Sequence, residues 1–126
     1  WLVNVAQAGL FLSIHLNAFP SSGASGAQTF YTLRYDGNKW VATLIQDELK
    51  DNLENTKRVA KSIDHVYVLK HAKKPGALVE VGFLSNSRER QELIQSSYQE
   101  KIAASVYKGI MRYFTEEPIE DEEDNQ

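Results

Sequence analysis

Runs of apolar residues divide the chain into four predicted strands. The first, Leu10–Ala18, has four large apolar residues among its first five, which is typical of a strand buried on both faces of a sheet. Residues 27–33 and 65–69 are rich in β-branched and aromatic residues and predict two more strands. Residues 77–81 predict a fourth strand, which is apolar enough to be buried as well.

Apolar residues at helical spacing predict three full helices. Between Lys39 and about Asn55 they form one stripe, with Asn38 as the expected N-cap and Gln46 on the solvent side. Capping-box patterns beginning at Asn86 and Ser97 open two further helices, expected to end near residues 94 and 114. The core-facing stripe expected on the last helix consists of Ile102, Ala103, Val106, Tyr107, Ile110, Met111 and Phe114.

The two ends of the chain differ from its body. Residues 1–8 are typical of the last turns of a helix that ends at Gly9. Residues 116–126 contain seven of the 17 acidic residues and neither Lys nor Arg, so we expect a solvated, disordered tail. The body, residues 1–115, then carries 14 basic and 10 acidic residues, a net charge of +4.

Composition narrows the class of protein further. A chain of 126 residues suits one domain, and no apolar run approaches the ~20 residues that a membrane-spanning helix needs. The absence of cysteine excludes disulfides and thiolate metal sites. The body's charge is compatible with an acidic polymer but too weak to indicate nucleic acid, and no Gly-rich phosphate loop supports a nucleotide-binding domain. Strands separated by helices favour an α/β fold with helices on both faces of the sheet.

His15 lies where the first predicted strand ends, ahead of Asn17 and a small-residue loop at 20–26. A strand fixes a side chain at this position while the loop leaves it accessible, which suits a ligating or catalytic group. An isolated histidine is also commonly a partly buried residue bonded to the backbone, and this residue alone leaves both readings open. His65 and His71 are expected to be an ordinary strand-start residue and a loop residue.

Glu80 is the most unusual residue of the chain, because it lies within the apolar run 77–84. A carboxylate there is costly unless it is paired or hydrogen-bonded, and such a group suits general acid–base catalysis. The alternative is a glutamate that reaches the sheet edge or pairs with a nearby lysine. Together with His15, it suggests metal-assisted hydrolysis, although a catalytic zinc site takes three protein ligands.

Three segments, 13–18, 26–31 and 78–86, together resemble the zinc-dependent N-acetylmuramoyl-L-alanine amidases in order and spacing. The likeness extends from about residue 4 to residue 114, and residues 53–73 are most similar to the germination-specific type of spore-forming bacilli. The resemblance implies a mixed, mostly parallel twisted sheet of the amidase or phosphorylase/hydrolase-like fold.

The resemblance also implies an activity and a site. Such enzymes hydrolyse the amide between N-acetylmuramic acid and L-alanine in peptidoglycan, and the germination type takes part in forming muramic lactam in the spore cortex. His15 would be a Zn²⁺ ligand and Glu80 the catalytic acid/base. The residues expected to border the substrate groove are Asn17, Lys70, His71 and Lys73. The protein would act outside the cytoplasm, in the cell wall or spore envelope.

The family's other two zinc ligands, a His in a His-Gly-Gly turn and a Glu on the following helix, have no counterpart in this chain. We therefore expect residues 1–115 to be the C-terminal two-thirds of one catalytic domain, without the N-terminal strand–helix part. Alone, they should bind zinc poorly, show little activity and expose a sheet edge that allows self-association. The alternative is an inactive cell-wall-binding or interaction module, which the missing ligands favour and the Glu80 motif opposes.

Overall fold

The computed structural model describes residues 9–17 and 23–118, so the helix predicted at 1–8 and most of the predicted tail lie outside the described residues. Strands and helices alternate irregularly along the chain. In order, the elements are β1 (Phe11–Asn17), β2 (Gln28–Tyr31), α2 (Asp36–Leu53), β3 (Lys61–Ser62), α3 (Tyr67–His71), β4 (Gly76–Phe83), α4 (Ser87–Leu93) and α5 (Ser96–Thr115).

The four strands form one sheet in the order β1-β4-β2-β3. The pairs β1–β4 and β2–β3 are parallel, whereas β2 and β4 are antiparallel. The predicted mixed, mostly parallel sheet is therefore confirmed. The strand β3 was not predicted, because two exposed residues within a polar connection carry no strand pattern.

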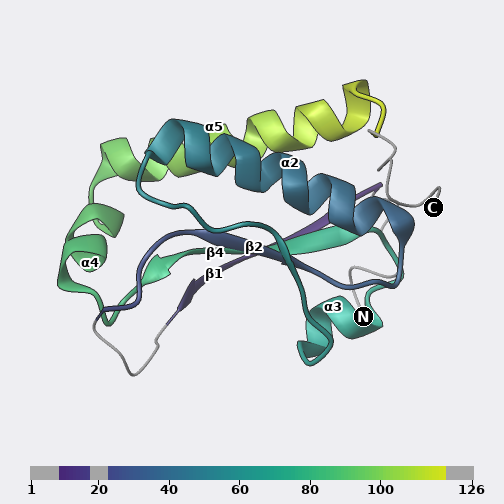
Figure 1. Cartoon of the computed structure of the whole chain (residues 1–126), viewed down its shortest axis with the longest axis horizontal. Coiled ribbons are helices and arrows are strands. Elements are labelled where there is room, and N and C mark those ends of the chain that lie inside the picture. Colours follow the sequence, from purple (N-terminus) through teal and green to yellow (C-terminus); the bar gives the residue numbers. More distant parts are fainter. Residues whose placement is uncertain (1–8, 18–22, 119–126) are drawn as a thin grey trace, which may run out of the picture.

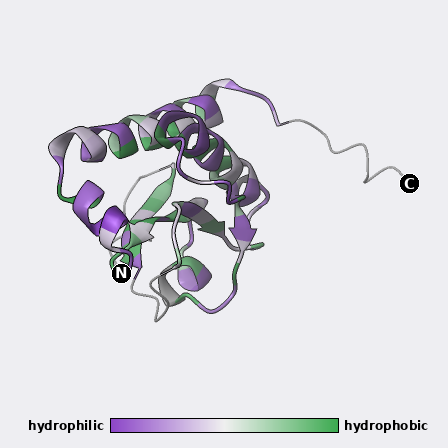
Figure 2. Cartoon of the chain, turned by 60° about the vertical axis from the view of Figure 1, so that its left-hand side comes forward, coloured by the Kyte–Doolittle hydropathy of each residue, from purple (hydrophilic) through white to green (hydrophobic). Residues whose placement is uncertain are grey.

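Helices α2 and α5 pack side by side on one face of the sheet, and the short α3 lies on the other (Figure 1). This arrangement confirms the prediction of helices on both faces. The core lies between the helix pair and the sheet, where Val41 and Ile45 of α2 meet Val79 and Val81 of β4. Figure 2 shows apolar green both on strands of the sheet and on parts of the helices, beside hydrophilic purple.

β4 is buried along nearly its whole length, as predicted, because β1 and β2 flank it. The prediction that the first strand is buried on both faces is wrong. β1 forms one edge of the described sheet, and Ile14 and Leu16 are 56% and 51% exposed. Leu10 and Leu12 pack against the core, so strand alternation points Ile14 and Leu16 to the same face as α2 and α5, beyond the cover of these helices.

The prediction of a strand at 65–69 is also wrong. This run leads into the helix α3, which begins after Val66 and ends at His71. Leu69 and Ala72 are buried, and the Arg34 guanidinium donates to the carbonyl of Lys70 at 2.8 Å. A five-residue apolar run does not distinguish a strand from a helical turn, so tertiary packing decides between them.

Helix α2 starts three residues earlier than predicted, which places Asn38 inside its first turn rather than at the N-cap. The Asn38 amide nitrogen donates to the Thr32 carbonyl at 3.2 Å, and its oxygen accepts from the Gly76 N–H at 2.8 Å. Gln46, predicted to face solvent, is 1% exposed. Its oxygen accepts from the Thr29 N–H, and its nitrogen donates to the carbonyls of Ala27 and Arg58. Burial of both amides is tolerated because each satisfies backbone groups.

The ends of α4 and α5 lie within a residue or two of the predicted positions, but the predicted core face of α5 is partly wrong. Four residues of the predicted stripe are exposed, namely Ala103, Tyr107, Met111 and Phe114. The small residues Ser105 and Gly109 face α2 instead. A Cβ at Gly109 would lie only 2.7 Å from the Cα of Ile45. The close approach of the two helices therefore selects the small residues. No helix in the described part of the chain is long and apolar enough to cross a membrane.

Candidate active site on the sheet face opposite α2 and α5

Three polar side chains form a row across three neighbouring strands. His15 of β1 is the register partner of Glu80 of β4, which is in turn the partner of Gln28 of β2. Partners in register point to the same face, and adjacent strands lie about 4.8 Å apart. The structure thus brings His15 and Glu80 side by side. Because Val79 and Val81 face α2, this row occupies the opposite face.

The His15 side chain is exposed, and its Nε2 lies 2.6 Å from the Ser13 hydroxyl. Nδ1 has no hydrogen-bond partner among the described residues. This arrangement differs from the alternative reading, in which a partly buried histidine bonds to the backbone. It leaves one ring nitrogen open on a side chain that the strand holds in place.

The Glu80 carboxylate is half-buried, and its Oε2 accepts a hydrogen bond of 2.7 Å from the Asn17 amide nitrogen. The β1–β4 register shifts between His15 and Asn17, and the Leu84 N–H donates to the Asn17 carbonyl at 2.7 Å. This local irregularity fixes Asn17 against β4. No ion pair between Glu80 and a lysine is present in residues 9–17 and 23–118, so the lysine alternative is not observed.

This arrangement can perform proton transfer. Asn17 holds one oxygen of the Glu80 carboxylate, while the other has no partner among the described residues, and Glu80 is the register partner of the exposed His15. A carboxylate held in this way can accept a proton from a reacting group and return it to another, provided the reacting group lies within hydrogen-bond reach.

The sequence analysis missed the side chain that supports this end of the sheet. Glu89 of α4 is 1% exposed, and both of its carboxylate oxygens accept from the Gly26 N–H, at 3.1 and 3.0 Å. One of them also accepts from the Phe83 N–H at 3.2 Å. Asn86 caps α4 as predicted, but Glu89 does not complete a capping box and instead ties the residues before β2 to the end of β4.

Gln28, the third member of the row, was missed as well. Its oxygen accepts from Nη1 of Arg58 at 3.2 Å, and its amide nitrogen donates to the Val59 carbonyl at 2.9 Å. Arg58 comes from the connection after α2, which the sequence analysis described only as basic and polar. A possible signal was the position of Gln28 within the segment 26–31 that carries the family resemblance.

Asn17 lies at the row, but the other residues expected to border the substrate groove do not. Lys70 and His71 end α3, and Lys73 lies in the loop that leads to the start of β4 at Gly76. Glu80 follows four residues later, about 13 Å along the strand. The structure therefore separates these three residues from the His15–Glu80 pair.

The donor set decides whether this part of the chain fits a metal ion. His15 offers an open imidazole nitrogen beside a carboxylate, which fits one ligand of a zinc site together with its neighbouring base. Among residues 9–17 and 23–118, no three His, Asp or Glu side chains are grouped so that they could hold a metal ion. A catalytic zinc takes about three protein ligands, so the described residues supply one part of such a site.

Comparisons with known proteins agree with the resemblance inferred from the motifs. Residues 2–112 match the sequence profile of the family described as N-acetylmuramoyl-L-alanine amidase. The chain is 56% identical over 115 residues to the germination-specific N-acetylmuramoyl-L-alanine amidase of Bacillus subtilis, covering 91% of this chain and 48% of that protein. It is 39% identical over 111 residues to the amidase LytC of the same organism, covering 86% of this chain and 22% of LytC.

Solved structures show the same fold. The CwlD amidase from Clostridioides difficile, solved in complex with the GerS lipoprotein, matches with a TM-score of 0.87 and 41% identity over 91% of this chain and 59% of that chain. An N-acetylmuramoyl-L-alanine amidase from Clostridium difficile 630 matches with a TM-score of 0.85 and 29% identity, covering 92% and 63% of the two chains. The chain thus spans roughly half of its germination-specific relative and less than two thirds of these structures.

Proposed function

Because the chain belongs to the N-acetylmuramoyl-L-alanine amidase family, we propose that it supplies the catalytic carboxylate and one zinc ligand of a peptidoglycan hydrolase. The bond cleaved is the amide between N-acetylmuramic acid and L-alanine. The observation that carries this proposal is the register pairing of His15 with Glu80 on an open sheet face. A binding module has no need of a carboxylate placed within a buried strand.

Glu80 acts as the general acid and base in this proposal. The Asn17 amide holds Oε2, which leaves Oε1 to accept a proton from the attacking water and to pass it to the leaving amine. The half-buried position of Glu80 limits competition from bulk water. Asn17 thus positions the base and also borders the groove.

His15 would be a Zn²⁺ ligand in this proposal, and the contact of Nε2 with the Ser13 hydroxyl orients the ring and leaves Nδ1 available. Bound zinc supplies a Lewis acid that polarises the scissile carbonyl and acidifies water. The remaining ligands would come from residues other than those described. Because the family's other two ligand motifs have no counterpart in the sequence, we expect residues 1–126 alone to bind zinc at well below one equivalent and to show little activity.

The wider setting of the reaction follows from the relatives. We infer action outside the cytoplasm, in the cell wall or spore envelope, and a role in spore cortex maturation or germination like that named for the B. subtilis relative. Lys70, His71 and Lys73 then contact a more distant part of the glycan–peptide substrate, given their separation from Glu80. A lipoprotein partner, as named for the CwlD structure, is a further possibility to test by co-purification.

The test compares residues 1–126 with a longer polypeptide that includes upstream sequence, measuring zinc content and peptide release from purified peptidoglycan. In the longer polypeptide, Glu80→Gln should keep zinc and lose at least about 100-fold in turnover. His15→Ala should lose both zinc and turnover. Glu100→Gln, an exposed carboxylate on α5, is the matched control and should change neither quantity.

Full turnover in Glu80→Gln would refute the assigned base. Stoichiometric zinc in His15→Ala would refute the assigned ligand. Peptidoglycan binding without peptide release by the longer polypeptide would favour the alternative, a cell-wall-binding module without catalysis.

A further inference from the structure

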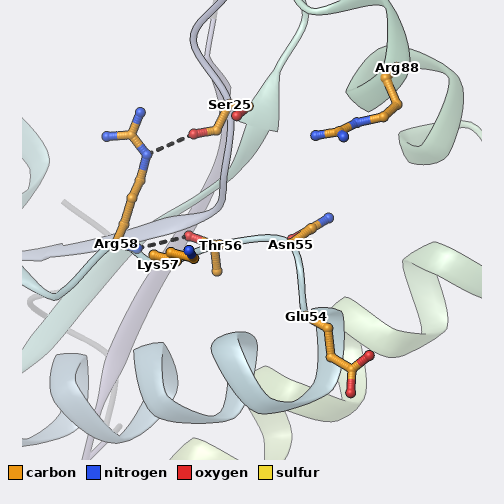
Figure 3. Close-up of a pocket in the computed structure, with 7 residues that line it drawn as sticks. All are labelled: Ser25, Glu54, Asn55, Thr56, Lys57, Arg58 and Arg88. Atoms are coloured by element: carbon orange, nitrogen blue, oxygen red, sulfur yellow. Dashed lines mark hydrogen bonds between the residues drawn. The ribbon is translucent and has the colours of Figure 1, made fainter.

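A second polar site lies next to the row of His15, Glu80 and Gln28. It is an open pocket of about 640 Å³, and we call it the basic pocket. Its lining residues are Ser25, Glu54, Asn55, Thr56, Lys57, Arg58 and Arg88. In Figure 3, Arg88 reaches from α4 toward the gap between Ser25 and Asn55, while the Glu54 carboxylate points away from both arginines.

The lining carries three cations and one carboxylate. None of the ion pairs formed between described residues includes Lys57, Arg58 or Arg88. Glu92 accepts from the Asn55 amide nitrogen at 3.5 Å, and the Tyr98 hydroxyl accepts from the same nitrogen at 2.8 Å. Burial raises the pKa of the Tyr98 hydroxyl, although its bond to Asn55 acts the other way, so Tyr98 adds no negative charge near neutral pH.

Arg58 is held in one orientation. Its Nε donates to the Ser25 carbonyl at 2.8 Å, its Nη1 donates to Gln28, and its guanidinium lies 5.2 Å from the centre of the Phe83 ring. A guanidinium has five N–H donors in a rigid plane, and the others have no hydrogen-bond partner among the described residues. A planar cation with open donors is suited to bind a carboxylate.

The basic pocket is linked to the proposed active site through the contact of Arg58 with Gln28. Arg58 borders the pocket and bonds to Gln28, and Gln28 is the register partner of Glu80. One strand spacing, about 5 Å, separates Glu80 from Gln28, and the Arg58 guanidinium lies one hydrogen bond beyond Gln28. An extended peptide advances roughly 3.4 Å per residue, so the second or third residue beyond a bond cleaved at Glu80 reaches Arg58.

We propose that the basic pocket is a carboxylate subsite for the acidic peptide of the substrate, with Arg58 and Arg88 as the recognising residues. The proposal rests on the proposed function, because it places the scissile amide at Glu80. It assigns the peptide to the β2 side of the row and the glycan to the β1 side. Two observations favour a carboxylate as the ligand. The Arg58 guanidinium is planar and keeps open N–H donors, and the lining carries more positive than negative charge.

The binding test uses two labelled peptides that differ in one group. The first is L-Ala-γ-D-Glu-L-Lys amide carrying an N-terminal fluorophore, and the second has the glutamate α-carboxylate converted to an amide. Binding to residues 1–126 is followed by fluorescence anisotropy at low ionic strength, which requires no catalysis. The acidic peptide should bind about tenfold more tightly than its neutral analogue.

Arg88→Gln is the principal variant, because this side chain is exposed and its loss should leave the fold intact. This variant should bind the acidic peptide about tenfold more weakly and the neutral peptide with unchanged affinity. Arg90→Gln removes the same charge from the same helix outside the lining and should change binding less than twofold. Arg58→Lys keeps the charge but loses the planar guanidinium group, so it should also weaken binding of the acidic peptide.

Equal binding of the two peptides, or equal effects of Arg88→Gln and Arg90→Gln, would overturn the subsite. Displacement of the acidic peptide by an equal concentration of sulfate would overturn its specificity for a carboxylate peptide. Failure of the proposed function looks different, because the longer polypeptide would then release no peptide even though the binding pattern holds. Conversely, turnover that is insensitive to Arg88→Gln and to the glutamate carboxylate would retain the function and reject the subsite.

Discussion

Glu80 is partly and Glu89 almost wholly shielded from water, and each carboxylate serves a different purpose. Glu80 has one oxygen held by Asn17 and the other without a partner among the described residues. Glu89 is enclosed and accepts from two backbone N–H groups that belong to segments far apart in sequence. A buried carboxylate is tolerable only with such partners, and here the partners determine which residue is available for chemistry and which for structure.

Glu89→Gln should lower the free energy of unfolding by about 1–3 kcal/mol. The amide nitrogen that replaces one carboxylate oxygen cannot accept a hydrogen bond from the N–H of Gly26 or Phe83. The substitution therefore leaves a buried N–H or NH₂ group without a partner. Urea denaturation followed by far-UV circular dichroism measures this change. The control is Glu92→Gln, a half-buried position on the same helix, whose free energy of unfolding should stay within about 0.5 kcal/mol of the wild-type value. Equal losses of stability in both variants would contradict the role given to Glu89.

Residue-scale prediction from the sequence succeeded where a polar residue interrupts or ends an apolar run, as at Glu80 and His15. It failed at Gln46, Glu89 and Arg58, each of which has a partner 12 or more residues away in the chain. A polar residue in an ordinary helical or loop pattern carries no local sign that its side chain crosses the fold. The candidate base was thus accessible from sequence, and the residues that surround it were not.

At the scale of elements, helix limits were easier to predict than helix faces. Both long helices have strong periodic patterns, and α5 ends at Thr115, next to the predicted position. Its buried face is nevertheless set by contact with α2, where Gly109 meets Ile45 and the Asn52 amide nitrogen donates to the Ser105 hydroxyl at 3.0 Å. Hydrophobicity alone assigned Tyr107 and Met111 to this face, because a pattern contains no information on how closely two helices approach.

Gly109→Ala should lower the free energy of unfolding by roughly 1–3 kcal/mol, since the added methyl would overlap the backbone of α2. Helix propensity alone predicts the opposite sign, because Ala is favoured over Gly within a helix. Thermal unfolding followed by circular dichroism distinguishes the two. Ala104→Gly, partly buried on the same helix, shows the propensity effect separately, and a stabilised Gly109→Ala would refute the close contact.

At the scale of the whole molecule, one edge of the described sheet is β1, and apolar side chains on it are left open. The sequence analysis anticipated an open edge but not its position, because strand order depends on pairings between distant segments. The α/β class followed from the alternation of strands and helices, and the mixed, mostly parallel sheet from the family resemblance. The antiparallel β2–β4 pairing itself has no local signature.

Residues 1–126 should self-associate through this edge, in a concentration-dependent manner visible by sedimentation velocity between about 5 and 200 µM. Replacing Ile14 and Leu16 together by Lys should shift the population to monomer, because charge on an edge strand blocks edge-to-edge pairing. Leu33→Lys, an exposed position away from β1, is the control and should leave the association intact. A wild-type chain that stays monomeric throughout the range would disprove this expectation.

The side chains of His15, Glu80 and Gln28 form a row only because β1, β4 and β2 pair in one fixed register. This register limits which insertions and deletions the chain can tolerate. Substitutions elsewhere in β1 leave the register in place. A single inserted or deleted residue between Phe11 and His15 would turn the imidazole to the face of α2 and α5, while leaving the sheet able to form. The length of this segment is therefore under tighter constraint than its composition.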